Sequence, residues 1–216
     1  MKYLKNILLF FIILLITLTY SCKKDSKTLT IKGSINSSDE NTADISISIL
    51  GKKVKAGAFN ANFQTLKTGK TDASGNYSIE IEKENISEYK ISISKYKYFT
   101  IEDVFYSSNF KDGVFSKNYT INPSAEITII VKNTTPSDNT DFFRYKITSG
   151  YINTIGSCSE ISEFKGTDID EEYTCNVIGT QNAVFEWTKA KNGNTTTGTK
   201  SVFCDVDSEN LIEFYY

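Results

Sequence analysis

The chain is predicted to be all-β, with two tandem antiparallel β-sandwich domains after a cleaved N-terminal signal peptide. Short runs rich in Ile, Val, Thr, Tyr and Phe alternate with polar residues at a period of two, and turn-forming residues separate the runs. Residues 45–49 and 77–81 are clean alternations, as expected of strands that bury one face. No segment after position 21 shows sustained helical periodicity. About 195 residues follow that position, and two sandwiches fit the usual domain size better than one.

Residues 1–21 are predicted to be a bacterial lipoprotein signal peptide. Lys2 and Lys5 supply the positive charge at its start, and residues 7–18 form an apolar run that contains the polar Thr17. This run is shorter than the roughly 20 apolar residues that span a bilayer, but it matches the apolar region of an export signal. We therefore expect the segment to be removed during export.

Cys22 is the predicted lipidation site. Ser21 before it and the polar residues after it resemble a lipobox followed by a tether over residues 22–27. Several acyl chains, such as palmitate, would hold the protein stably at a membrane, whereas one chain holds it marginally. The sequence thus predicts a lipid-anchored protein of the cell envelope, at the outer membrane, with the leaflet left open. The alternative is a cysteine that happens to follow a secretory signal.

The composition excludes several kinds of chemistry. The sequence has no histidine, which removes Ser-His and Cys-His nucleophile pairs, histidine acid–base catalysis and the commonest zinc ligand. Arg144 is the single arginine and the net charge is −2, so nucleic acid is not an expected partner. We expect no cofactor and no enzymatic activity. Carboxylate-pair chemistry, lysine-assisted catalysis and an oxygen-lined cation site remain as alternatives.

Residues 28–122 are predicted to form the first domain, and residues 123–216 the second. Pro123 cannot donate a hydrogen bond within a sheet, so it disrupts a central strand and suits a junction. A new apolar strand begins at Ala125. The domain boundary is therefore placed between Asn122 and Ser124.

Residues 71–77 carry the clearest local signature of the first domain. Asp72 can accept hydrogen bonds from nearby backbone amides, and Gly75 can supply a positive φ. We interpret the segment as the turn of a hairpin. A calcium loop formed by Asp72, Ser74 and Asn76 is the alternative.

The first domain resembles the carboxypeptidase regulatory-like domain. The resemblance rests on residues 31–35, 43–49, 71–77 and 89–99, although Lys97-Tyr98 stands where that family has Gly-Tyr. It implies a seven-stranded, transthyretin-like sandwich with an accessory or binding role and no shared active-site residues.

The second domain has a layout similar to the C-terminal sandwich found behind such a domain in small lipoproteins of Bacteroidota. Trp187 is the single tryptophan, and core packing is its expected role, with ligand stacking as the alternative. The predicted strands are residues 125–133, 142–148, 173–178, 183–189, 199–205 and 211–216.

Three cysteines follow Cys22 and all lie in the second domain. An exported chain is in an environment that allows disulfides, and three thiols allow one bond. We favour Cys158–Cys175, which would attach the long connection after Gly150 to the next strand and stabilise the fold by about 3 kcal/mol. Cys204 would then be a small buried residue. A bond that involves Cys204 is the alternative.

Three acidic clusters are candidates for a cation site or for a glycosidase carboxylate pair. None has the pattern of an EF-hand loop, so we expect solvated charge and no metal. The clusters are Asp168 with Asp170, Glu171 and Glu172; Asp205 with Asp207 and Glu209; and Asp138 with Asp141.

Aromatic residues crowd positions 96–119. Some should face the core, and Tyr106, Phe110 and Phe115 lie near predicted loop tips, where they could form a stacking platform for sugar rings or a protein partner. The sequence therefore predicts a membrane-anchored, non-enzymatic binding or accessory module whose partner is a glycan, a peptide or an envelope protein. The alternatives are a structural spacer or assembly subunit without a ligand and, more remotely, a small carboxylate-dependent hydrolase.

Overall fold

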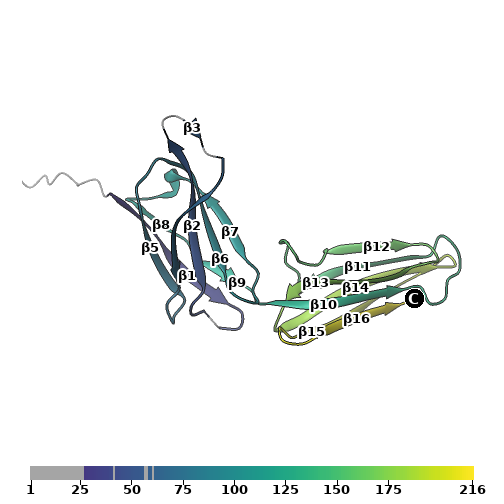
Figure 1. Ribbon diagram of the computed structural model, residues 1–216. Helices are drawn as coiled ribbons and strands as arrows, with labels where there is room; N and C mark the ends of the chain where they lie inside the picture. The colour runs from purple at the N-terminus through teal and green to yellow at the C-terminus, as the bar shows by residue number, and fades with distance from the viewer. Residues whose placement is uncertain (1–26, 41, 56–57, 60) are drawn as a thin grey trace, which may run out of the picture.

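The computed structural model describes residues 27–216 apart from 41, 56–57 and 60 (Figure 1). The predicted signal peptide and Cys22 lie outside the described residues. In the described part of the chain, no helix is long and apolar enough to cross a membrane. Strands make up most of it, which confirms the all-β class.

The first domain is a sandwich whose two sheets enclose one hydrophobic core. One sheet has the order β5-β1-β8, with β9 also paired to β1, and the other has the order β3-β2-β6-β7, with β4 also paired to β2. The elements in chain order are β1 (Thr28–Ser37), β2 (Ser46–Lys55), β3 (Ala58–Phe59), β4 (Gln64–Lys70), β5 (Asn76–Glu82), β6 (Ile86–Ser94), β7 (Ile101–Phe105), η1 (Ser107–Asn109), β8 (Val114–Ser116) and β9 (Tyr119–Ile121).

The alternating runs bury the faces expected of them. On β2, Ile47 and Ile49 are fully buried and lie opposite Ile93 and Ile91 of β6. On β5, Tyr77, Ile79 and Ile81 are also buried, while the polar residues between them face solvent. Burying one of these isoleucine side chains contributes about 1.5–3 kcal/mol, so the alternation itself determines which face points inward.

The segment between β4 and β5 is a turn, as predicted. The Asp72 carboxylate accepts hydrogen bonds from the backbone amides of Ser74 and Asn76, both at 2.9 Å, and the amide of Asn76 is the main cause that lowers its pKa. Gly75 has a φ of +78°, and a Cβ at this position would lie 2.5 Å from the carbonyl oxygen of Ile35. The position therefore requires glycine.

The second domain is a separate sandwich with its own core. Its sheets have the orders β13-β10-β16 and β12-β11-β14-β15. Inward-facing Ile127, Ile129 and Val131 of β10 pack in one core with Phe143 of β11 and Phe185 of β14. The strands are β10 (Ser124–Lys132), β11 (Phe142–Ser149), β12 (Ile161–Lys165), β13 (Asp170–Ile178), β14 (Gln181–Lys191), β15 (Asn194–Cys204) and β16 (Asn210–Tyr215).

The sandwiches are mainly antiparallel, as predicted, and each also contains parallel pairing that the sequence did not indicate. In the first domain, β1 pairs in parallel with β8 and with β9. In the second domain, β10 pairs in parallel with β16. In each domain the closing strand thus returns to the opening strand. Such long-range pairing leaves no local turn signal in the sequence.

A disulfide bond joins Cys158 to Cys175, the pair favoured from the sequence. It attaches the connection between β11 and β12 to β13, next to the backbone bridge between Ser157 and Asn176. Cys204 is fully buried and, among the described residues, is the free cysteine.

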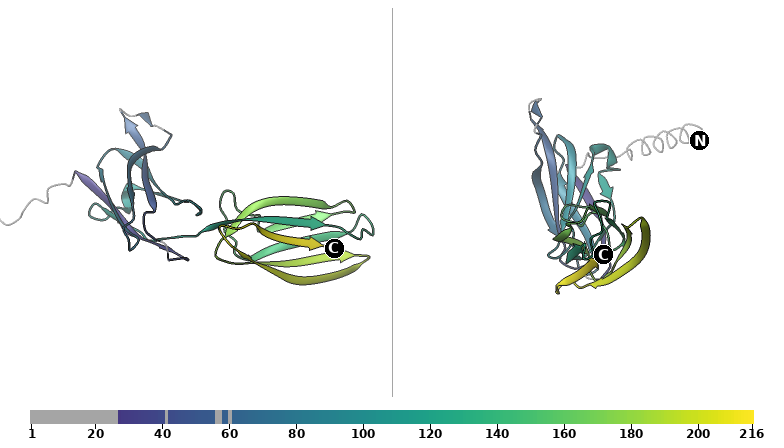
Figure 2. Two further views of the ribbon diagram at one scale, coloured as in Figure 1. Left: turned by 60° about the horizontal axis from the view of Figure 1, so that its bottom comes forward. Right: turned by 90° about the vertical axis from the view of Figure 1, so that its right-hand side faces the viewer.

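Asn122 and Pro123 are the two residues between β9 of the first domain and β10 of the second. Figures 1 and 2 show two elongated bodies that meet end to end at this point. The carbonyl oxygen of Asn122 accepts a hydrogen bond from the amide of Phe99 at 3.0 Å, and that of Pro123 accepts one from Gly179 at 2.9 Å. Each of the two connecting residues is thus hydrogen-bonded through its carbonyl group to one of the two domains.

Candidate binding groove between the two domains

A groove of about 840 Å³ lies beside the joint, and we refer to it as the interdomain groove. Its floor is the outer face of the β13-β10-β16 sheet, and its walls are the β6–β7 connection and the turn between β15 and β16. Its lining includes Tyr96, Lys97, Tyr98, Glu126, Glu172 and Asp207.

The alternation along β10 creates the floor of the groove. The odd-numbered residues from 125 to 131 are buried in the core, so Glu126, Thr128 and Ile130 point to the opposite face. On the neighbouring β13, Asn176 lies opposite Glu126, and Glu172 lies opposite Ile130. The floor therefore offers hydrogen-bonding and charged groups with one apolar contact among them.

Lys97 connects the two walls. Its ammonium group forms an ion pair with the Asp207 carboxylate, and this hydrogen bond is the main cause that raises the pKa of Lys97. Its backbone lies in the left-handed region, with a φ of 61°, and its carbonyl oxygen accepts a hydrogen bond from the amide of Ser124 at 2.8 Å. The exposed ion pair adds little stability by itself, but it fixes where the walls meet.

Two tyrosines on the first-domain wall differ in what they offer a ligand. Tyr96 is 86% exposed, and its ring lies 5.7 Å from the Lys97 ammonium. Tyr98 donates a hydrogen bond from its hydroxyl to Asp39; burial and this bond raise the pKa of Tyr98 to about 12, so the hydroxyl stays neutral at neutral pH. Tyr96 is therefore the group free to stack on a ligand.

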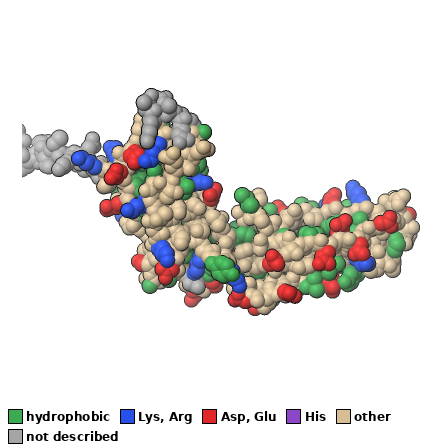
Figure 3. Space-filling model, viewed as in Figure 1, with side chains coloured by type: hydrophobic (Ala, Val, Ile, Leu, Met, Phe, Trp, Pro, Cys, Tyr) green, Lys and Arg blue, Asp and Glu red, His purple; other side chains and the backbone are tan. Residues whose placement is uncertain are grey.

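The charged residues that line the groove are mostly acidic. Glu126, Glu172, Asp207 and Glu209 contribute carboxylates, and Lys97 is the basic residue among the lining groups. On the face shown in Figure 3, the charged side chains of the second domain are also mostly acidic. Such a lining attracts cationic partners and repels anionic ones.

The predicted aromatic platform is not formed. Phe115 is buried, and its ring stacks on Phe105 with the centroids 4.1 Å apart. Phe110 is partly buried and packs edge-on against Tyr89 at 5.3 Å. Tyr106 remains exposed, so the three residues do not share one surface. These rings pack inward because η1 folds the segment after β7 back over the core of the first domain.

The structure separates Asp170 from the 205–209 turn, whereas Glu172 of the first cluster lines the interdomain groove together with Asp207 and Glu209. Asp170 lies on β13 rather than in a loop and pairs with Lys132, at the end of β10 away from the groove. Asn210, which follows the 205–209 turn, lies opposite Ile127 near the other end. At about 3.3 Å per residue, Asp170 and Asn210 lie roughly 15 Å or more apart along the strand. Among the described residues, no group of three His, Cys, Asp or Glu side chains could hold a metal ion.

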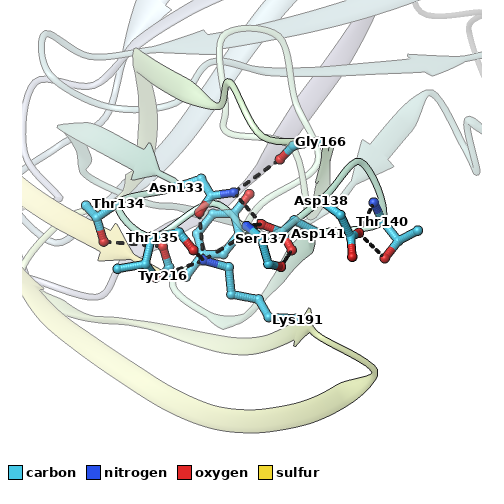
Figure 4. Close-up of polar contacts among 10 residues, drawn as sticks. All are labelled: Asn133, Thr134, Thr135, Ser137, Asp138, Thr140, Asp141, Gly166, Lys191 and Tyr216. Atoms are coloured by element: carbon cyan, nitrogen blue, oxygen red, sulfur yellow. Dashed lines mark hydrogen bonds and ion pairs between the residues drawn. The ribbon is translucent and has the colours of Figure 1, made fainter.

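Asp141 is fully buried, which corrects the prediction of solvated charge at this position. Its carboxylate accepts hydrogen bonds from the Ser137 hydroxyl, from the Ser137 amide at 2.9 Å and from the Asn133 amide group at 2.8 Å (Figure 4). Those bonds, together with the ammonium of Lys191 at 3.8 Å, hold the pKa of Asp141 well below its usual range. This cluster was not predictable from the sequence, because its members lie at the ends of three different strands.

Trp187 packs partly buried against the second core, as expected. It lines a smaller cavity of about 290 Å³ with Phe143, Tyr215 and Tyr216. Lys189 and Lys200 lie at the edge of this cavity, so its character is aromatic and basic, unlike that of the interdomain groove.

No protein-family model and no curated protein matches the chain. The resemblance of residues 28–122 to the carboxypeptidase regulatory-like domain therefore stays a prediction. Solved structures do match, at low identity. A streptococcal ancillary pilin has 12% identity and a TM-score of 0.33, with 89% of this chain and 63% of that chain covered. This chain thus spans less than two thirds of that pilin chain.

Two further pilins are similar to the chain. The shaft pilin SpaA of Lactobacillus rhamnosus GG has 9% identity and a TM-score of 0.34, with 87% of this chain and 97% of that chain covered. BcpA, the major pilin subunit of Bacillus cereus, has 13% identity and a TM-score of 0.28, with 81% and 67% covered. At these identities the similarity concerns the β-sandwich fold alone.

Proposed function

We propose that the chain is a membrane-anchored, non-enzymatic binding module of the cell envelope and that it holds its partner in the interdomain groove. The observation that carries this proposal is the groove itself, where an exposed aromatic ring stands above a floor of carboxylates and amides. Aromatic stacking with convergent polar groups suits a sugar or a peptide. The acidic lining favours a partner with amines or lysines over an anionic polysaccharide.

Binding of the full-length protein to an array of neutral, amine-bearing and anionic glycans and of basic peptides tests this proposal. Tyr96→Ala should weaken binding about tenfold, as expected for the loss of one stacking contact. Tyr106→Ala is the matched control, because Tyr106 is an exposed tyrosine that does not line the groove. Equal effects of the two substitutions, or no ligand on the array, would reject the groove as the binding site.

The charge of the groove gives an independent test of the partner's class. Glu172→Lys should weaken the binding of a cationic partner, and the loss should shrink at high salt because surface charges are screened. A partner that binds the variant more tightly would be anionic and would contradict the proposed class.

The membrane anchor is part of the proposal and rests on the predicted lipidation of Cys22. Cys22→Ala should abolish labelling by palmitate and move the protein out of the membrane fraction. Protease treatment of intact cells then distinguishes a surface protein, which is digested, from a periplasmic one, which is protected. A surface protein would bind a ligand from the environment, and a periplasmic protein would bind another component of the cell envelope.

A spacer without its own ligand is the second candidate function, and the joint between the domains favours it. Two consecutive carbonyl groups, of Asn122 and Pro123, are bonded to different domains, and Lys97 forms an ion pair with Asp207 across the joint. In small-angle scattering, the wild type should give a narrow distribution of interdomain distances. Lys97→Ala should broaden it. A broad distribution in the wild type would reject the spacer.

A further inference from the structure

Asn133, Asp141 and Lys191 meet at the far end of the second domain (Figure 4). Asn133 follows β10 directly, Lys191 is the last residue of β14, and Asp141 precedes β11. The side chains are well shielded: Asn133 is 7% exposed, Asp141 is 0% exposed and the Lys191 side chain is 15% exposed. A lysine amine thus lies in a largely shielded position against an uncharged carboxamide.

The hydrogen bonds fix the orientation of the Asn133 carboxamide. Its Nδ2 donates to Asp141 Oδ2 at 2.8 Å and to the carbonyl oxygen of Gly166 at 3.2 Å. Both partners are acceptors, so the nitrogen must face them and Oδ1 must face the other way. Oδ1 accepts a hydrogen bond from the Lys191 ammonium at 2.7 Å, so the lysine nitrogen contacts the carbonyl group of the amide.

Lys191 is held in this position by the loop that follows Asn133. Its Nζ donates to the carbonyl oxygen of Thr135 at 2.6 Å and to the Thr135 hydroxyl at 3.0 Å. A deprotonated amine can keep both bonds with its two hydrogens, and its lone pair is then free to point at Asn133.

We propose that Lys191 and Asn133 react with each other to form an intramolecular isopeptide bond. The Lys191 nitrogen attacks Cγ of Asn133, a new carbon–nitrogen bond forms, and the bond from Cγ to Nδ2 breaks. The former Nδ2 leaves as ammonia. The overall change converts a lysine ammonium and a carboxamide into a secondary amide and an ammonium ion, so charge and atoms balance and no oxidant is needed.

Asp141 carries the proton in this reaction. Its Oδ2 lies 3.8 Å from the Lys191 nitrogen and 2.8 Å from the Asn133 nitrogen, which is the leaving group. The same carboxylate oxygen is already hydrogen-bonded to the departing nitrogen, and it can take the proton of the ammonium once Lys191 moves from 3.8 Å to hydrogen-bond distance. Holding all three groups in place replaces encounters in solution, and a reaction that occurs once per molecule needs no rapid turnover.

The bond would join the two sheets of the second sandwich. Asn133 continues β10 of one sheet, and Lys191 ends β14 of the other. The two residues are 58 positions apart, so the link would close a long loop at the end opposite the joint. Like the disulfide, the link would reduce the conformational entropy of the unfolded chain. Unlike the disulfide, it could not be broken by a reducing agent.

Peptide mapping of the full-length protein after reduction and trypsin digestion tests the proposal. Trypsin cuts after Lys132, Arg144, Lys189 and Lys200, and it does not cut at an acylated Lys191. The expected product is a branched peptide of residues 133–144 and 190–200 with the summed mass less one ammonia. Two separate linear peptides of unchanged mass in the folded wild type would overturn the proposal.

Variants identify the reacting groups. Lys191→Arg keeps the positive charge but removes the amine, and Asn133→Ala removes the acyl carbon; both should lack the branched peptide completely. Lys189→Arg, two positions away on the same strand, should retain the link, and because trypsin also cuts after arginine it should give the same branched peptide. Asp141→Asn should slow the linkage about 100-fold or more, as expected for the loss of a proton-transfer group. Linkage at the wild-type rate in folded Asp141→Asn would overturn the role of Asp141.

Discussion

The ring of Trp187 lies directly over Gly198 of the neighbouring strand. The two residues are paired across β14 and β15, and a Cβ at position 198 would come within 2.4 Å of the indole ring. The absence of a side chain at Gly198 therefore leaves the room that the indole ring of Trp187 occupies.

Gly198→Ala should displace the indole and destabilise the second domain by about 1–3 kcal/mol, as expected for overpacking. Trp187 is the single tryptophan, so its fluorescence reports the change directly, and urea denaturation gives the free energy of unfolding. Gly193→Ala is a useful comparison. No atom lies within 4 Å of a Cβ there, although its φ of +75° makes the substitution strained for a different reason. An unchanged emission spectrum in Gly198→Ala would contradict the packing described.

Phe105→Ala should destabilise the first domain by about 3–5 kcal/mol, because the ring is buried between Phe115 and Tyr89. Tyr106→Ala, one residue later and 52% exposed, should change stability by about 0.5 kcal/mol or less. Thermal or urea denaturation of the two variants measures the difference. Similar losses would mean that the aromatic cluster is not the core described here.

Replacing both Cys158 and Cys175 by serine should lower the free energy of unfolding by about 3 kcal/mol, the usual effect of opening a loop of this length. Cys204→Ala, which removes a buried thiol outside the bond, should cost about 1 kcal/mol. Burial also raises the pKa of the Cys204 thiol, so the thiol should react with an alkylating agent after unfolding and not before. Rapid labelling of Cys204 in the folded protein would contradict its burial.

The second domain should lose stability in acid through Asp141. The pKa of its carboxyl group is depressed in the folded state, whereas an unfolded aspartate titrates near pH 3.9. The contribution of the carboxylate is therefore fully present above about pH 4 and is lost as the pH falls toward the folded pKa. Urea denaturation between neutral pH and about pH 2 measures the slope, and Asp141→Asn should reduce it. Asp138→Asn provides a control at an exposed aspartate in the same loop.

The alternating runs allowed much of the fold to be predicted. A hydrophobic repeat every second residue indicates a β-strand and also indicates which face of that strand is buried. Ile45–Ile49 and Tyr77–Ile81 illustrate this. The parallel pairing of β10 with β16 was not predictable, because the two strands are separated by most of the domain and no turn connects them. The disulfide could be proposed because three thiols allow few pairings.

The candidate sites were less accessible to sequence reasoning. Phe110 and Phe115 follow a short turn whose direction depends on the core it covers, so their burial is not visible in their spacing. Tyr96 and Asp207 line one groove because two domains meet there. The hydrophobic pattern of each domain predicts the strands of that domain and does not predict which loops of the two domains come together. The sequence around Asp141 is typical of an exposed loop. Its burial depends on Asn133, Ser137 and Lys191, which contact it only in the folded domain.

The two-residue joint also determines how far the protein reaches. The first described residues and Tyr216 lie at opposite ends of the molecule, with Asn122 and Pro123 between the domains (Figure 1). With an acyl anchor at Cys22, the first sandwich would stand nearest the lipid and the second would project beyond it. A joint that holds the angle between the domains would make the distance of the outermost loops from the membrane a property of the fold.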